Sequence, residues 1–527
     1  MAYYKDLREY VDVLKARGKL FHIKREINKD TELMPLVRWQ FRGLQEKDRG
    51  AFLFDNIVDA KGNKFNVPLL VCCYAPSTEV YAIGMMCEPK DILDKWTQAQ
   101  LHPIAPVMVN QAPVQEIVHQ GDSLLEHGGL MEFPIPLSTP GFDNAPYITA
   151  GSWVTKDPET GERNVGVYRG MLRSSTRTGI NCYAPQHLRI HWEKCKSKGI
   201  PLQAAIILGS PPNIGYVGCT KIPFGTDEYS IAGGISGEPV ELVKCKTVDL
   251  EVPANAEVII EGTLPTDLME FEGPFGEHPG YLGSRNVDPY FNITCITHRK
   301  NPIDTAWMDQ FPPSEDTKIR NIAYCAVFYK FLKYDCNIPG VLDVALHEES
   351  GSNQFCVIKM KKSYPAESWQ ALFGISALNP NWGKIVVVVD EDIDPRDMDS
   401  VTWALCYRMQ PHRDIRIVPG KSAPLDPSAA SPEVLHGNRE TVPTSALLID
   451  ATMKWPYPPV SLPRKEYMDK ARQIWEAEGL PALSPKVPWH GYTLGHWTEE
   501  NIEEANLAVK GEWEKTGEKF IQQRQKA

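Results

Sequence analysis

Cysteine pairs of the Cys-x-x-Cys type are absent from this sequence, although its 527 residues include 12 cysteines. Zinc ribbons and many iron–sulfur sites are built on such pairs, so the cysteines indicate neither kind of framework. No secretory leader is recognisable in the first residues, which enter directly into a charged amphipathic stretch. We therefore expect reduced thiols and a cytoplasmic protein.

Long hydrophobic runs and an excess of basic charge are lacking too. The longest β-branched run, at 385–389, is far too short to cross a bilayer, so no membrane partner is expected. The 56 basic and 67 acidic side chains give a formal net charge of −11. A general nucleic-acid binder would carry a basic surface, so nucleic acid is not an expected partner either.

What is present is the composition of an ordinary globular protein, with 42% hydrophobic and 23% charged residues. A chain of this length predicts about three domains. Residues 1–120 alternate helix and strand patterns and predict an N-terminal α/β domain. Asp6 is a candidate N-cap, and Gly18 ends the helical spacing that follows it. Further strands are expected at 20–23 and 68–73, and a helix at 91–100.

Residues 121–320 have a different texture, with short β-type runs separated by Gly and Pro turns. Regular short strands of this kind are typical of a barrel or sandwich. The clear helix candidate in this region lies at 187–198. The β-type runs lie at 147–154, 164–171, 203–208, 240–246, 257–262 and 290–297.

Residues 321–490 return to an α/β pattern. A buried strand at 384–390, a helix at 398–408 and a strand at 415–420 predict a parallel βαβ unit. A helical tail at 491–527, with its helical pattern over 499–525, closes the chain. The fold class predicted for the whole chain is therefore α/β plus β.

The stretch 271–281 is the most unusual in the chain, because it sets Glu272 and Glu277 among three glycines and two prolines. This density of helix breakers predicts a tight loop that can bring both acids into one pocket. Phe271, Phe275 and Tyr281 interleave with the acids and suggest that the loop lies against a core. Two carboxylates in one apolar pocket have their pKa values pushed apart, so one can hold a proton near neutral pH. The alternative interpretation is a solvated acidic turn.

Three other stretches carry candidate polar groups. Asn164 and Arg169 belong to a strand-like block, and because side chains alternate on a strand, a bulge or curl is needed for both to meet one ligand. His187 opens a helix, whose N-terminus favours phosphate. Glu238 ends a glycine-rich stretch at 233–240 that is neither a dinucleotide fingerprint nor a P-loop. Taken singly, Arg169 and His187 are more often structural, but Asn, His and Glu together suit Mn²⁺, Mg²⁺ or Fe²⁺.

Taken together, these blocks resemble the UbiD family of reversible decarboxylases, which use prenylated FMN. The resemblance implies an N-terminal α/β domain, a central split β-barrel that binds flavin, and a C-terminal α/β domain that mediates oligomerisation. The matching blocks are Asn-x-Gly-x-Tyr-Arg at 164–169, Pro-Gln-His at 185–187, Gly-Glu-Pro-Val at 237–240, Glu-Gly-Pro-Phe-Gly-Glu at 272–277 and Asp-Ala-Thr-Met-Lys-Trp-Pro at 450–456.

The resemblance also implies the residues that bind the cofactor and its ions. Asn164, His187 and Glu238 would hold a divalent metal, usually Mn²⁺, on the cofactor phosphate, and K⁺ would lie near Cys219 and Thr220. The expected cofactor-binding residues are Asn164, Val167, Tyr168, Arg169, Asn181, Cys182, Tyr183, Gln186, His187, Glu238 and Lys454.

Arg169, Glu272 and Glu277 match the catalytic constellation of the family, with Glu277 as the acid/base group. The implied reaction is the reversible, non-oxidative decarboxylation of an aromatic acid. Its substrate would be a hydroxybenzoate-like acid, a polycyclic aryl acid or an aryl-CoA thioester such as phthaloyl-CoA. The implied partners are CO₂, a flavin prenyltransferase that supplies the cofactor, and further copies of the chain in a dimer to hexamer.

Two alternatives remain at this point. The chain could be the catalytic-fold subunit of a multi-subunit aryl carboxylase, which predicts flavin binding without CO₂ exchange by the purified chain. It could also be a metal-dependent hydrolase that uses Glu272 and Glu277 as an acid/base pair, which predicts activity without flavin.

Overall fold

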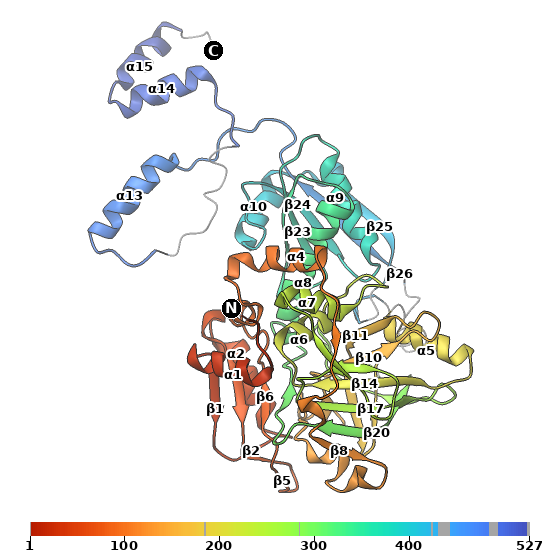
Figure 1. Cartoon of the computed structure of the whole chain (residues 1–527). Coiled ribbons are helices and arrows are strands. Elements are labelled where there is room, and N and C mark those ends of the chain that lie inside the picture. Colours follow the sequence, from red (N-terminus) through yellow and green to blue (C-terminus); the bar gives the residue numbers. More distant parts are fainter. Residues whose placement is uncertain are drawn as a thin grey trace.

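The computed structural model describes residues 2–183, 186–283, 285–422, 425–429, 443–483 and 494–523. Pro185 of the Pro-Gln-His block lies outside these residues. In chain order they form an N-terminal α/β layer, a curled central sheet and a C-terminal sheet, beyond which further helices extend (Figure 1). No helix in these ranges is long and apolar enough to cross a membrane.

The N-terminal layer is built on a sheet in the order β1-β3-β6-β21. Asp6 caps α1 as predicted, because its carboxylate accepts the Glu9 N–H at 3.0 Å. β21 (Asp304–Ala306) pairs in parallel with β6, so a segment far along the chain completes this sheet. The other elements are α1 (Leu7–Ala16), β1 (Leu20–Ile23), β2 (Ile27–Asn28), α2 (Leu33–Gly43), β3 (Ala51–Phe54), β4 (Ile57–Val58), β5 (Lys64–Phe65), β6 (Leu69–Val71), α3 (Thr78–Met85) and α4 (Ile92–Leu101).

The central sheet runs in the order β11-β10-β14-β17-β20-β13-β12-β9, with β8 paired on β20. β11 ends at Val167 and β12 begins at Gly170, yet they stand near opposite ends of this order. Since so short a connection spans at most about 11 Å, the sheet must curl until its ends meet, which is the predicted split barrel. The strands are β8 (Ile117–Gln120), β9 (Tyr147–Ile148), β10 (Ser152–Lys156), β11 (Arg163–Val167), β12 (Gly170–Ser174), β13 (Arg177–Gly179), β14 (Leu202–Leu208), β17 (Val258–Leu264) and β20 (Tyr290–His298).

Helices α5 (His187–Ser197), α6 (Pro212–Cys219) and α7 (Glu228–Ser236) pack around the barrel. The predicted glycine-rich loop begins inside α7. A Cβ at Gly233 would lie 2.4 Å from the carbonyl oxygen of Ile104, and one at Gly234 would lie 2.7 Å from that of Ala99. The glycines therefore permit close packing of this helix. The strand expected at 240–246 is β15 (Glu241–Lys244), which pairs with β7 (Val107–Met108) and β16 (Glu251–Pro253) outside the barrel.

The C-terminal sheet has the order β22-β23-β24-β26-β25. The prediction of a parallel unit over 384–420 is wrong, because β25 runs antiparallel to β26 whereas β24 runs parallel to it. The parallel neighbours of β24 are β23 and β26. The elements are α8 (Glu315–Lys330), β22 (Val341–Leu346), β23 (Phe355–Met360), α9 (Glu367–Leu378), β24 (Ile385–Asp390), α10 (Met398–Tyr407), α11 (Pro411–Asp414), β25 (Ile415–Ser422) and β26 (Pro443–Ala451).

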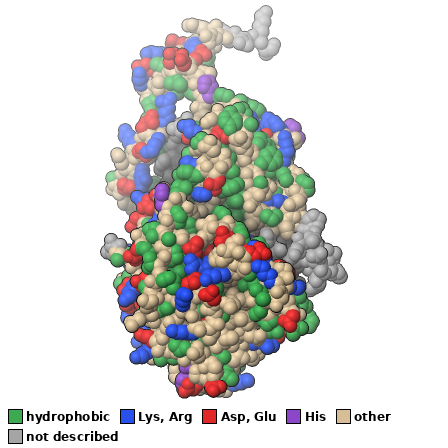
Figure 2. Space-filling view, turned by 45° about the vertical axis from the view of Figure 1, so that its right-hand side comes forward, with side chains coloured by type: hydrophobic (Ala, Val, Ile, Leu, Met, Phe, Trp, Pro, Cys, Tyr) green, Lys and Arg blue, Asp and Glu red, His purple; other side chains and the backbone are tan. Residues whose placement is uncertain are grey.

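Three helices follow the C-terminal sheet and stand away from the rest of the chain in Figure 1: α13 (Lys465–Ala477), α14 (Glu499–Val509) and α15 (Trp513–Gln522). The helical pattern predicted over 499–525 is thus divided between α14 and α15. On the face shown in Figure 2, basic and acidic side chains are interspersed, which agrees with the lack of a basic excess in the sequence. The domain boundaries at 120, 320 and 490 stay predictions.

Candidate active site

The acidic stretch is a hairpin end followed by a tight loop. Glu272 ends β18 (Glu270–Glu272), which pairs antiparallel with β19 (Asn286–Asp288). The loop then folds on itself, because the Gly283 N–H donates to the Phe275 carbonyl at 2.7 Å and the Glu277 N–H donates to the Tyr281 carbonyl at 2.9 Å. This is the compact loop that the glycines and prolines predict.

The aromatic residues of this loop do not all face the core. Phe275 is buried and its ring lies 4.2 Å from that of Tyr147. Phe271 and Tyr281 are 65% and 64% exposed, so Phe275 is the one of the three that packs the loop against a core. Strand alternation explains Phe271, because its neighbour Glu272 takes the buried side of β18.

Arg169 joins the two acids. Its Nε and Nη2 donate to the two carboxylate oxygens of Glu272 at 2.9 and 2.7 Å, and its Nη1 donates to Glu277 Oε1. Arg169 lies in the short turn between β11 and β12, where the barrel closes. The curl that the sequence required for Asn164 and Arg169 to face one ligand is therefore supplied by the closure of the sheet.

The electrostatics of this network favour a charged Arg169. Burial alone would lower the pKa of Arg169, but the charges of Glu277 and Glu272 outweigh it and raise that pKa well above its usual value. The side chain of Glu272 is fully buried, whereas that of Glu277 is 13% exposed. The Arg169 guanidinium also lies 5.2 Å from the centre of the Phe275 ring. Glu277 is thus the acid of the pair that a ligand can reach.

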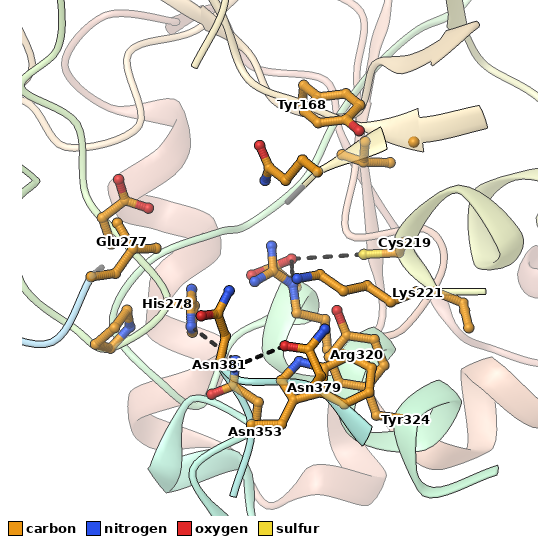
Figure 3. A pocket seen from close by; sticks show the side chains of 18 of the residues that line it. Tyr168, Cys219, Lys221, Glu277, His278, Arg320, Tyr324, Asn353, Asn379 and Asn381 are labelled. Carbon is orange, nitrogen blue, oxygen red and sulfur yellow. Dashed lines mark hydrogen bonds and ion pairs between the residues drawn. The ribbon is translucent and has the colours of Figure 1, made fainter. Parts of the chain in front are cut away.

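A cavity of about 710 Å³ opens beside this network, between the barrel and the C-terminal sheet. In Figure 3, Glu277 and His278 lie on one side of it, and Cys219 and Lys221 lie on the other. Of the residues expected to bind the cofactor, its lining includes Asn164, Val167, Tyr168, Arg169, Asn181, Tyr183, Gln186 and His187.

Three other expected residues do not line the cavity. Cys182 is buried in the hydrophobic core of the barrel. Lys454 donates to the carbonyl oxygens of Asp450 and Thr452, both at 2.8 Å, which holds its ammonium group against its own backbone. Glu238 follows the end of α7 and is exposed to solvent.

Glu228, which the sequence analysis missed, occupies the place expected for Glu238. It begins α7, is 3% exposed and lines the cavity together with Asn164 and His187. Because the rest of α7 is apolar and packed, its first glutamate is carried into the interior. The signal in the sequence is an acid at the start of a run of small apolar residues.

Burial disfavours the charged form of Glu228 more than the groups around it stabilise that form. Its carboxylate accepts the Val165 N–H at 3.1 Å. Burial raises its pKa to about 8, because the lowering by backbone hydrogen bonds and by Arg163 is smaller. His187 has its pKa lowered by burial and by Lys221, so its ring is neutral near pH 7. A neutral imidazole, an amide and a buried carboxylate form a donor set that fits a divalent cation.

Basic side chains also line the cavity. Burial lowers the pKa of Lys221 to about 8, with a further contribution from the charge of Arg320. Arg320 pairs with Asp316 at 2.9 Å. Lys221, Arg320 and Lys384 all line the cavity and offer positive charge to an anionic ligand.

Family comparisons agree with this architecture. Two family models match the chain: the 3-octaprenyl-4-hydroxybenzoate carboxy-lyase Rift-related domain at residues 106–309 and the C-terminal domain of the same carboxy-lyase at residues 319–451. The chain therefore belongs to the UbiD family of carboxy-lyases, as its motifs predicted. An uncharacterized protein of Aquifex aeolicus is 32% identical over 507 residues, which cover 90% of this chain and 99% of the relative.

Solved structures of UbiD-class enzymes have the same fold. HmfF of Pelotomaculum thermopropionicum, in complex with prFMN, is 29% identical with a TM-score of 0.75, over 89% of this chain and 100% of that one. The closed form of vanillic acid decarboxylase from Sedimentibacter hydroxybenzoicus is 26% identical with a TM-score of 0.80, over 90% of this chain and 100% of that one. The predicted fold class is thereby confirmed.

Proposed function

We propose that this chain binds prenylated FMN in the cavity and catalyses the reversible decarboxylation of an aromatic acid. The observation that carries this proposal is the Arg169–Glu272–Glu277 network at one side of the cavity. The same cavity is lined by Asn164, His187 and Glu228. Its support from relatives is that HmfF has been solved with prFMN and that two others are decarboxylases of vanillic and 3,4-dihydroxybenzoic acid.

The residues present fit the cofactor and its ions. Asn164, His187 and Glu228 would hold a divalent metal, Mn²⁺, Mg²⁺ or Fe²⁺. This metal would help to bind the cofactor phosphate. Lys221 lies in the same cavity and would add positive charge. Cys219 and Thr220 also line the cavity and are where K⁺ would bind.

The chain's own residues have distinct parts in the reaction. Bound prenylated FMN would supply the electron sink that no amino-acid side chain offers. Arg169 would orient the substrate carboxylate, and its bidentate contact with Glu272 fixes the guanidinium plane. Glu277 would deliver a proton to the carbon that loses CO₂, because it is the accessible acid of the network. In the carboxylation direction the same carboxylate would accept that proton.

The geometry argues against a hydrolase with two acids on either side of a bond. Both oxygens of Glu272 are engaged by Arg169 and the side chain is fully buried, so Glu272 has no face for a substrate. The alternative of a subunit of a multi-subunit carboxylase also predicts flavin binding, but it predicts no CO₂ exchange by the purified chain. The intact Arg169–Glu272–Glu277 network favours catalysis by this chain. A flavin prenyltransferase would supply the cofactor, and we propose a homo-oligomer of dimer to hexamer size.

The test uses the full chain co-expressed with a flavin prenyltransferase and purified without oxygen. We expect a mass of prenylated FMN at near-stoichiometric occupancy and exchange of labelled CO₂ into one or more aromatic acids. Glu277→Gln should keep the flavin and lose turnover by at least ~10²-fold, the scale of general acid–base catalysis. Flavin binding without CO₂ exchange would favour the subunit alternative, and exchange without flavin would refute the proposal.

A further inference from the structure

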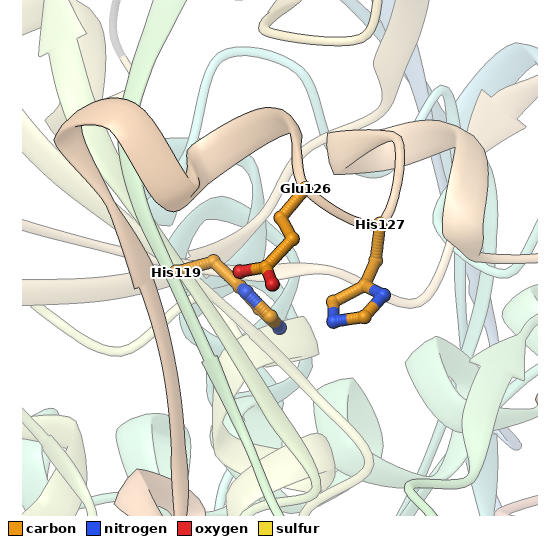
Figure 4. Close-up of side chains that lie close together, drawn as sticks. All are labelled: His119, Glu126 and His127. Atoms are coloured by element: carbon orange, nitrogen blue, oxygen red, sulfur yellow. The ribbon is translucent and has the colours of Figure 1, made fainter.

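A second group of metal-ligand side chains lies at the edge of the barrel, and none of its members lines the cavity. β8 and β20 pair antiparallel, with His119 opposite Ile296. Because side chains alternate along a strand, His298 lies on the same face as Ile296 and therefore as His119. The chain then turns back through η4 (Gly121–Leu125) and η5 (Gly129–Glu132). This return brings Glu126 and His127 beside His119 (Figure 4), and it brings Glu132 beside both His119 and His298.

His119 is shared by two triads of possible ligands. One consists of His119, Glu132 and His298, and the other of His119, Glu126 and His127. Within each triad the ligand atoms all lie within 4.8 Å of one another. The triad of His119, Glu132 and His298 brings together side chains from three segments of the chain.

The separation of the two buried histidines matches a shared ion. His119 Nε2 and His298 Nε2 are 3.2 Å apart. Two nitrogen ligands in a tetrahedral zinc site, each with a Zn–N distance of about 2.0–2.1 Å, lie about 3.3 Å from each other. One ion between these nitrogens therefore requires almost no movement of either ring.

The hydrogen bond of His298 also suits a metal ligand. Its Nδ1 lies 2.8 Å from the carbonyl oxygen of Arg299. A carbonyl only accepts, so Nδ1 donates this hydrogen bond, and Nε2 is the ring nitrogen that faces His119. A backbone carbonyl on the far nitrogen is the usual support of a metal-binding histidine.

We propose that His119, Glu132 and His298 bind one Zn²⁺ ion. Two imidazoles and a carboxylate form a donor set that zinc favours. His119 and His298 are buried and Glu132 is partly buried, so the ion has a path from solvent beside Glu132. The ion ties the segment that leads into the barrel to β20, and its role is structural.

The experiment measures Zn²⁺ bound to the full chain after treatment with a chelator. All variants carry Glu228→Gln, which weakens binding in the cavity, and metal is counted per chain by mass spectrometry after gel filtration. His298→Gln and the milder Glu132→Gln test the site. His102→Gln, which changes an exposed histidine outside the group, is the matched control. Co²⁺ replaces Zn²⁺ in a parallel series, because tetrahedral Co²⁺ has a distinct visible spectrum.

The proposal expects one more equivalent of Zn²⁺ in the His102→Gln chain than in the His298→Gln chain. Glu132→Gln should weaken the same equivalent by at least ~10-fold. The visible spectrum of tetrahedral Co²⁺ should be absent from the His298→Gln chain. Equal Zn²⁺ in folded control and His298→Gln chains would mean that the two histidines share only a hydrogen bond, and would overturn the proposal. If His298→Gln does not fold, the same comparison rests on Glu132→Gln, and unchanged affinity there would overturn it.

Discussion

Glu228 begins helix α7 and Glu238 follows the end of the same helix, but their side chains lie in different environments. Glu228 is buried in the cavity wall, and Glu238 is exposed. We expect Glu228→Gln to remove most of the bound Mn²⁺ and, with it, most of the flavin, because a neutral amide replaces the one carboxylate of the donor set. The amide oxygen can still accept the Val165 N–H, so the fold should persist.

Glu238→Gln is the control for that experiment, since it removes the same charge from the surface. Metal content by mass spectrometry and flavin absorbance per chain should match the unmodified protein. Loss of metal in Glu238→Gln with full retention in Glu228→Gln would contradict the assignment and restore Glu238 as the ligand.

Functional residues could be predicted from the sequence where the neighbouring residues determine the local backbone structure. The prediction failed where burial and long-range contacts determine whether a side chain reaches the cavity. Glu272 and Glu277 stand out because glycine and proline dictate a loop around them. The choice of Glu238 rested on the resemblance of the Gly-Glu-Pro-Val block at 237–240, within a glycine-rich stretch whose first half is helical because it packs closely. Lys454 fits its motif, but backbone carbonyls hold it away from the cavity. No local pattern reveals such contacts.

At the scale of elements, the loop after β18 positions the proposed acid. A Cβ at Gly283 would lie 2.8 Å from Glu277 Oε1, closer than side chains tolerate. We expect Gly283→Ala to displace the Glu277 carboxylate and to lower kcat by roughly 10-fold or more, because small misplacements of a reacting group are costly. Flavin and metal content should stay unchanged.

Gly43→Ala provides the comparison, because a Cβ there meets nothing within 4 Å. Steady-state kinetics of CO₂ exchange would separate kcat from KM in both variants. Equal kcat in the two variants would show that the loop tolerates the methyl group and that Glu277 is not fixed by Gly283.

β21 contributes a pH dependence of stability. Burial raises the pKa of Asp304 to about 7, against about 3.9 for an ordinary aspartate in an unfolded chain. The folded state therefore binds this proton more tightly. Its stabilising contribution is complete below about pH 4 and is lost as the pH rises through about 7.

Asp304→Asn removes this titration while its amide oxygen can still accept the Thr305 N–H. We expect the variant to gain thermal stability over the unmodified chain at pH 8 and to gain less, or nothing, at pH 5. Melting temperatures at the two pH values measure the effect. Asp48→Asn, at an exposed position, should show no such difference. A gain of the same size at both pH values would mean that Asp304 does not titrate in this range.

At the scale of the whole molecule, the order of sheets was predictable but their pairing was not. The alternation of short strands with Gly and Pro turns indicated a barrel or a sandwich, because that pattern is local. β21 joins the first sheet although the whole central sheet lies between β6 and β21 in the sequence, and β25 reverses against β26. Such pairings depend on which edges meet in the folded chain, and no periodicity in the sequence records them.

The helices beyond the C-terminal sheet expose large hydrophobic side chains. None of the side chains of α13, α14 and α15 is buried in the single chain. On α15, Trp513, Phe520 and Ile521 are 62%, 57% and 63% exposed. Clusters of large exposed hydrophobic side chains on otherwise polar helices mark contacts with another protein surface.

We expect the double variant Phe520→Glu, Ile521→Glu to shift the protein toward smaller assemblies, because two buried charges at an apolar contact oppose association. Size-exclusion chromatography with light scattering would measure the mass. Lys515→Gln, an exposed change on the same helix, should leave the mass unchanged. The arginine–glutamate network and the cavity lie within one chain, so flavin binding should survive dissociation. An unchanged mass in the double variant would show that α15 lies outside the subunit interface.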